Sequence, residues 1–87
     1  MDFSDLIAVK INELMNENKI NASQLSKLTG IYRSTITMFL TRKNRTIRLE
    51  NLLYICDAFH IKLSEFFSDP RFDYAEANDW KQNKIED

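Results

Sequence analysis

The chain has 87 residues, a formal net charge of −1 and 44% hydrophobic residues, which fits one small folded domain rather than a disordered chain. No apolar run approaches the ~20 residues that a membrane-spanning helix needs. The first ten residues lack the basic start and long apolar stretch of a signal peptide, so we expect a cytoplasmic protein without a membrane partner. The single cysteine, Cys56, has no partner for an internal disulfide, which agrees with a reducing compartment.

The charges are unevenly distributed along the chain. Between residues 18 and 49 there are seven basic residues and none of the thirteen acidic ones, which all lie in the flanks. A basic block in an otherwise acidic chain is typical of a surface that binds a polyanion. An ordinary solvated surface patch explains the same pattern, so charge alone leaves both interpretations open. The basic residues are Lys19, Lys27, Arg33, Arg42, Lys43, Arg45 and Arg48.

The first half of the chain has apolar residues at helical spacing and no strand signal. We expect a first helix at about residues 4–18. Asn21 is expected to cap a second helix, with Gln24 as its partner in a capping box. This helix ends at Gly30, the only glycine, which suits the left-handed conformation that often ends a helix. A third helix is expected at about residues 33–41. The expected inward residues of the second and third helices are Leu25, Leu28, Ile36, Phe39 and Leu40.

The second half continues the helical pattern after a polar loop at residues 42–47. A fourth helix, at about residues 49–59, is apolar on more than one side and is therefore expected to be central. His60 is expected to end it in the left-handed region, and Ser64 to cap a short fifth helix. Asp69 and Pro70 are expected to begin a sixth segment. The prediction is an all-α domain of five to six helices at residues 1–69, followed by an acidic, helical segment at 70–87. The apolar residues of the fourth helix are Leu49, Leu52, Leu53, Ile55, Cys56 and Phe59.

Two short helices joined at a glycine match the helix-turn-helix pattern. The second of these helices begins with short polar and basic residues, which a helix needs in order to contact base edges in the major groove. Arg33 can bind guanine through two hydrogen bonds, which contributes ~1–3 kcal/mol of discrimination. Ser34 and Thr37 can hydrogen-bond to bases or phosphates, and Met38 can contact a thymine methyl group.

Two stretches, SQLSKLTGIYRSTIT and RLENLLYICDAFHIKLSEFF, resemble the Cro/C1-type (XRE) helix-turn-helix family of transcriptional repressors. The resemblance covers residues 20–67 and implies a compact lambda-repressor-like fold. It also implies a homodimer that binds an operator in double-stranded DNA. The core positions implied are Leu25, Ile31, Ile36 and Phe39, with Ser26 where the two helices cross. The implied base-contacting residues are Arg33, Ser34, Thr35, Thr37 and Met38. The expected phosphate-contacting residues are Tyr32, Arg42, Lys43, Asn44 and Arg45.

The sequence departs from the family pattern at four positions. Ala22 stands where many relatives have a glutamine that contacts DNA, so that contact is expected to be absent. Tyr32 stands at the usual Ser/Thr cap, and its ring is expected to lie against the DNA backbone. Arg42 replaces a common glycine near the end of the third helix, and Arg48 stands at the usual cap of the fourth. For Arg45 and Arg48, a phosphate contact and a plain surface position are both open.

The remaining motifs concern partners other than DNA. The C-terminal segment is rich in acidic residues and has three aromatic ones, Phe72, Tyr74 and Trp80, so it either packs on its own domain or forms a dimer or protein contact. The alternative function is an antitoxin or interaction module, in which the helix-turn-helix autoregulates an operon and this segment binds a partner protein. His60 and Cys56 have no ligand cluster or nucleophile pairing around them, so we expect no metal, no cofactor and no enzymatic activity.

Overall fold

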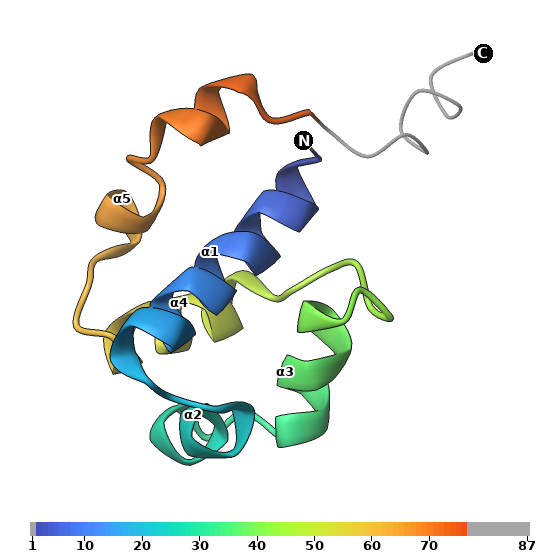
Figure 1. Cartoon of the computed structure of the whole chain (residues 1–87), viewed down its shortest axis with the longest axis vertical. Coiled ribbons are helices and arrows are strands. Elements are labelled where there is room, and N and C mark those ends of the chain that lie inside the picture. The colour runs from blue at the N-terminus through green and yellow to red at the C-terminus, as the bar shows by residue number, and fades with distance from the viewer. Residues whose placement is uncertain (1, 77–87) are drawn as a thin grey trace.

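The computed structural model describes residues 2–76, and this part of the chain is all-α (Figure 1). One isolated bridge, between Asp2 and Glu76, is its single element of β type. Figure 1 shows α1 running through the middle of the molecule, with α3 on one side and α5 and the orange segment that follows it on the other. The elements are α1 (Phe3–Asn18), α2 (Ala22–Thr29), α3 (Arg33–Leu40), α4 (Leu49–Ala58), α5 (Leu63–Phe66) and the 3-10 helix η1 (Pro70–Tyr74).

Most of the predicted helix ends are confirmed. The Asn21 side chain accepts a hydrogen bond from the Gln24 N–H at 2.8 Å, and the Gln24 side chain accepts one from the Asn21 N–H at 2.9 Å. These two bonds form the capping box of α2. Gly30 ends this helix with a φ of 79°, and His60 follows α4 with a φ of 59°, so both are in the left-handed region. Helices α3 and α4 each end one residue before the predicted end, at Leu40 and Ala58.

The core lies where α1, α2, α3 and α4 meet. Helix α1 packs against α3, α2 packs against both α3 and α4, and α5 packs against α4. Helix α4 contributes a stripe at the i, i+3, i+4, i+7 spacing of one helix face. These side chains belong to one hydrophobic cluster with buried residues of α1, α2, α3 and α5, and burial of this cluster holds the helices together. The most fully buried side chains are Leu6, Ile11, Leu25, Leu52, Ile55, Cys56 and Phe66.

Three predictions about these helices are wrong. Leu28 is 58% exposed, whereas Ser26 and Thr29 of the same helix hydrogen-bond to the Ile31 backbone in the following turn. Leu49 and Leu53 are 66% and 48% exposed, so α4 buries one stripe and is not central on all sides. Ser64 does not cap α5, because it lies inside the helix; Lys62 is the N-cap residue.

The C-terminal part of the described chain packs against α1. As predicted, Asp69 caps this segment and Pro70 is its first residue, but the segment is a short 3-10 helix, η1. Arg71 of η1 forms an ion pair with Glu13 of α1 at 2.8 Å. The Lys10 ammonium of α1 lies 3.2 Å from the Asp69 carboxylate. Charged side chains of α1 thus hold both the cap and the first turn of η1.

Aromatic side chains complete this contact. The Phe72 ring lies 5.0 to 6.0 Å, centre to centre, from the rings of Phe3, Phe66 and Phe67. The Phe3 backbone N–H donates to the Glu76 carbonyl at 2.7 Å. Residues 70–76 therefore pack on their own domain. The rest of the predicted acidic helix, including Trp80, lies outside the described residues, and the division of the chain after residue 69 stays a prediction.

Candidate nucleic-acid interface

The turn between α2 and α3 is held by hydrogen bonds within residues 26–31. The Gly30 N–H donates to the Ser26 carbonyl at 2.8 Å, and the Ser26 hydroxyl donates to the Ile31 carbonyl at 2.5 Å. The Ile31 N–H donates to the Thr29 hydroxyl at 3.1 Å, while the Ile31 side chain is buried. Because glycine takes a positive φ without a Cβ clash, the chain reverses here in one residue. These hydrogen bonds within the turn thus help to fix the orientation of α3 relative to α2.

Helix α3 buries one face and exposes the other. Ile36 and Phe39 are 4% and 3% exposed and anchor the helix in the core. The structure brings all of the predicted base-contacting residues to the exposed side, although their contact with bases stays a prediction. Those exposed residues are Arg33, Ser34, Thr35, Thr37 and Met38.

Tyr32 is the N-cap residue of α3, and its side chain is 81% exposed and makes no capping hydrogen bond. The first N–H groups of a helix have no acceptor within the helix, and they concentrate the positive end of its dipole. No side chain forms a capping hydrogen bond at the start of α3 within the described residues, so these N–H groups can attract an anion. The position of the Tyr32 ring is compatible with the predicted contact to a DNA backbone.

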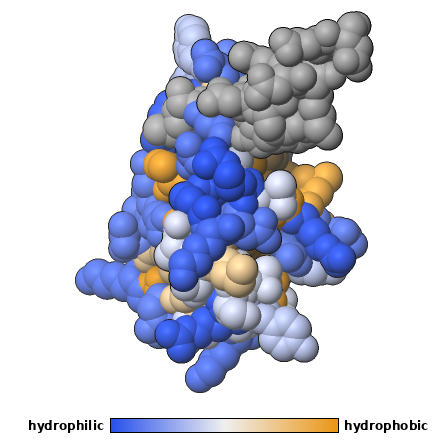
Figure 2. All heavy atoms as spheres, turned by 90° about the vertical axis from the view of Figure 1, so that its right-hand side faces the viewer, coloured by the Kyte–Doolittle hydropathy of each residue, from blue (hydrophilic) through white to orange (hydrophobic). Residues whose placement is uncertain are grey.

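The seven basic residues between residues 18 and 49 divide into two groups according to their ion pairs. Arg42 and Arg45 form ion pairs with Asp5 and Asp2 at the start of α1, at 2.9 and 2.6 Å. The other five form no ion pair within residues 2–76. Figure 2 looks onto the side of the molecule that carries α3 and the following loop, and this face is mainly hydrophilic. The five basic residues that have no acidic partner within residues 2–76 are Lys19, Lys27, Arg33, Lys43 and Arg48.

Arg42 lies against the protein, and its side chain is only 23% exposed. Its Nε donates to an Asp5 carboxylate oxygen at 2.9 Å, and its Nη1 donates to the Phe39 carbonyl at 3.1 Å. Its Nη2 donates to the Ser4 hydroxyl, and its guanidinium lies 4.9 Å from the centre of the Phe39 ring. These bonds use three of the five guanidinium N–H donors, so only the remaining N–H groups are free for the predicted phosphate contact of Arg42.

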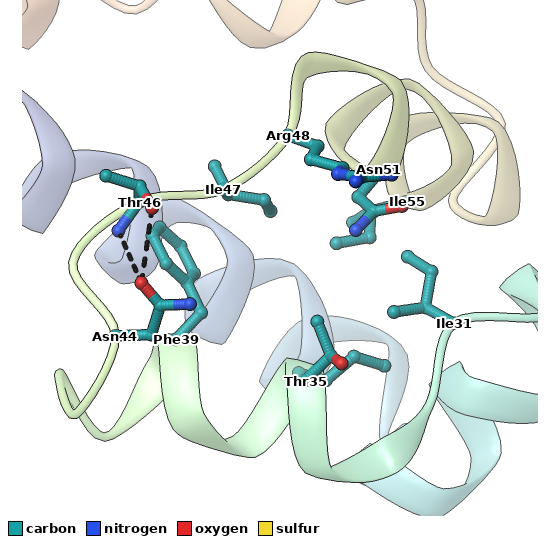
Figure 3. A pocket seen from close by; sticks show the side chains of 10 residues that line it. Ile31, Thr35, Phe39, Asn44, Thr46, Ile47, Arg48, Asn51 and Ile55 are labelled. Carbon is teal, nitrogen blue, oxygen red and sulfur yellow. Dashed lines mark hydrogen bonds between the residues drawn. The ribbon is translucent and has the colours of Figure 1, made fainter.

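A hollow of about 250 Å³ lies between α3, the loop that follows it and the start of α4 (Figure 3). The Asn44 side-chain oxygen accepts hydrogen bonds from the N–H and the hydroxyl of Thr46, both at 3.2 Å, and these bonds shape the loop. The Asn44 Nδ2–H groups stay available as donors. A second hollow extends past Arg48 to Tyr32 and Tyr54. The first hollow has an apolar wall of Ile31, Ile36, Phe39, Ile47 and Ile55, and polar residues Thr35, Asn44, Thr46, Arg48 and Asn51.

The family model of the Cro/C1-type HTH DNA-binding domain matches residues 10–71, which is more than half of the chain. The chain belongs to this family. The resemblance drawn from residues 20–67 is thereby confirmed, and the match extends it at both ends. No curated protein and no solved structure matches the chain. Among the described residues, no helix is long and apolar enough to cross a membrane.

This Cro/C1-type domain has arginine at position 42, where the family commonly has glycine. The structure gives a physical reason for the glycine, because Arg42 has a φ of 66°. An L-residue in this region costs ~1–2 kcal/mol. The contacts of Arg42 with Ser4, Asp5 and Phe39 offset that strain. Sequence reasoning missed Ser4 and Asp5, since they lie 38 and 37 residues away from Arg42 and outside the basic window.

Asn51 lines the first hollow and was not among the site residues predicted from the sequence. Asn51 lies in the first turn of α4, three residues after Arg48. Residues three apart in a helix share one face, so this spacing could have indicated that Asn51 lies beside Arg48. Cys56 is buried beneath this region, and burial raises the pKa of its thiol. Within residues 2–76, His, Cys, Asp and Glu side chains form no group of three or more that could hold a metal ion.

Proposed function

We propose that this Cro/C1-type domain is a sequence-specific transcriptional regulator, acting in the cytoplasm as a repressor and not as an enzyme. The observation that supports this proposal most directly is the exposed face of α3. Arg33, Ser34 and Thr37 are all exposed there, and Arg33 has no acidic partner within the described residues. A helix of this composition presents hydrogen-bond donors and acceptors to base edges when it enters the major groove.

The contacts would fall into two classes. Arg33 binds guanine through two of its guanidinium nitrogens, and Met38 contacts a thymine methyl group. The remaining exposed residues bind neighbouring base edges; they are Ser34, Thr35 and Thr37. Lys43, Asn44 and Arg45 follow α3 and contact phosphates on one side, while Tyr32 contacts the backbone at the other end of the helix. Phosphate contacts give affinity and register, whereas base contacts give specificity.

We further propose that the protein binds its operator as a homodimer. A two-fold protein matches an inverted repeat, and the two half-sites then lie about one helical turn apart, ~34 Å. A dimer on an operator that overlaps a promoter excludes RNA polymerase by steric overlap.

The test is selection of bound duplexes from a random pool at near-physiological salt, with the full chain. An enriched inverted repeat with the expected spacing supports specific binding by a dimer. A single enriched half-site contradicts the dimer and favours a monomer with a protein partner. Retention that depends on salt, with no enriched sequence, contradicts specific recognition.

The second candidate is an antitoxin or interaction module that binds a partner protein through its C-terminal segment. Tyr74, at the end of η1, is 82% exposed and favours this candidate, because large exposed aromatic side chains are common contact residues. A small co-transcribed toxin gene beside this one supports the candidate. A divergent promoter of the type that controls lysogeny argues against it.

A further inference from the structure

Arg42 connects two separate parts of the fold. Its backbone forms the turn that ends α3, where the Arg42 N–H donates to the Phe39 carbonyl at 3.1 Å. Its guanidinium lies against the Phe39 ring on α3 and donates to Ser4 and Asp5 on α1. One side chain therefore joins the last turn of the exposed helix to the first turn of the long central helix.

We propose that Arg42 is a positioning residue for DNA recognition and not a phosphate ligand. The inference rests on the proposed function and revises one phosphate contact that the sequence predicted. All three kinds of nitrogen in the Arg42 guanidinium, Nε, Nη1 and Nη2, donate to oxygens of the protein itself. A planar guanidinium has five N–H donors in a rigid fork, and here most of that fork faces inward.

The strained backbone supports a positioning role. A residue other than glycine at φ 66° persists where surrounding contacts hold it. Here two of those contacts, with Ser4 and Asp5, come from α1, which lies outside the helix-turn-helix. If they are lost, the end of α3 and the loop that presents Lys43 are free to shift. A small change in the orientation of α3 moves every base-contacting side chain at once. Loss of the Arg42 contacts with α1 should therefore weaken sequence-specific binding more than non-specific binding.

Asp5 tests the proposal, because the two roles of Arg42 predict opposite signs for the change in operator affinity. Asp5 also lies 3.6 Å from the Arg45 guanidinium, and release of Arg45 alone would strengthen binding to the operator and to a scrambled duplex alike. If Arg42 binds phosphate, Asp5 competes with DNA for it, and Asp5→Asn strengthens binding. If Arg42 positions α3, Asp5 helps to hold it, and Asp5→Asn weakens specific binding. Arg42→Lys separates the roles in a second way. Lysine keeps the positive charge that a phosphate contact needs, but its single ammonium cannot reproduce the guanidinium's fork.

The experiment measures the affinity of the full chain for the selected operator and for a scrambled duplex across a range of salt concentrations. It uses the wild type, Asp5→Asn, Arg42→Lys and the control Glu17→Gln. Glu17 is an exposed acid at the far end of α1 and forms no ion pair within residues 2–76. Thermal melting of each variant identifies the temperature range in which it is fully folded.

The positioning role predicts that Asp5→Asn and Arg42→Lys each lower operator affinity by about five- to tenfold. Affinity for the scrambled duplex and the salt slope then stay near the wild-type values, and Glu17→Gln changes neither. Tighter binding by Asp5→Asn, wild-type behaviour of both variants, or equal losses on both duplexes overturns the proposal. If Arg42→Lys does not fold, Ser4→Ala removes one of the same hydrogen bonds and is read in the same way. Failure of the wild type to prefer any sequence refutes the proposed function itself, and that result is distinct from the variant results.

Discussion

Arg71 and Glu13 lie 58 residues apart in the sequence and meet through two hydrogen bonds of 2.8 and 3.1 Å. The Arg71 guanidinium also donates to Asp69 at 2.7 Å, so one cation contacts two carboxylates. Hydrogen bonds from Arg71 hold the pKa values of Glu13 and Asp69 below their ordinary values of 4.5 and 3.8. This contact fastens η1 to α1.

These lowered pKa values predict an acid-sensitive attachment of η1. A carboxylate with a lowered folded-state pKa stabilises the fold above its ordinary pKa, and this contribution is lost as the pH falls through the lowered value. Arg71→Gln should therefore reduce the melting temperature at about pH 6, and its difference from the wild type should shrink toward about pH 2.5. Thermal melts followed by circular dichroism test this. Lys27→Gln, which removes a cation without an ion pair in the described residues, is the control. A constant difference at all pH values contradicts the prediction.

Arg33→Ala should abolish most of the sequence preference and leave most of the non-specific binding. The reason is that one bidentate contact to guanine contributes ~1–3 kcal/mol of discrimination between bases. Competition between the operator and a scrambled duplex measures the change. Lys27→Ala, on the outer side of α2, removes the same charge away from α3 and should leave the preference intact. An unchanged preference in Arg33→Ala refutes its assignment as a base contact.

Lys43→Ala should weaken binding to all duplexes alike. Lys43 is exposed and forms no ion pair within residues 2–76, so its ammonium is available to a phosphate. Loss of one phosphate contact lowers the slope of log K against log salt by about one unit. Titrations at several salt concentrations on two unrelated duplexes provide the measurement. A loss confined to one sequence shows instead that Lys43 contacts bases.

Gly30→Ala should destabilise the fold by ~1–2 kcal/mol through backbone strain alone. A Cβ atom at this position meets no heavy atom within 4 Å, so there is no steric clash to add to the effect of the φ of 79°. Asparagine tolerates the left-handed region better, so Gly30→Asn should cost less. Urea unfolding of the three chains compares them. Equal stability of wild type and Gly30→Ala would show that the turn relaxes at no cost.

Leu25→Ala and Leu28→Ala should differ sharply, although both residues are leucines of the same short helix. Leu25 is fully buried, and its truncation should cost ~2–5 kcal/mol by leaving a cavity. Leu28 is 58% exposed, and its truncation should change the unfolding free energy by less than ~0.5 kcal/mol. Chemical denaturation of the paired variants measures both values. A large loss for Leu28→Ala would show that this side chain is covered by another copy or partner.

Local signals in the sequence predicted the helix-turn-helix well. The capping box at Asn21, the glycine at position 30 and the cap at Asp69 each depend on residues a few positions apart, and all three are confirmed. The prediction was poorer for the apolar side chains. A short helix such as α2 has too few residues to define its buried face, and packing against its neighbours α3 and α4 determined which side was covered.

The sequence by itself determined the helix order, the sharp turn at Gly30 and the polar composition of the third helix, because these follow from hydrogen bonding and steric limits over a few residues. Only the tertiary structure decided which basic side chains stay available to DNA. Arg42 and Lys43 are neighbours in the chain, yet Arg42 pairs with Asp5 on α1 whereas Lys43 is exposed. Charge pairing across 37 residues depends on how the helices pack, and the local charge pattern does not contain that information.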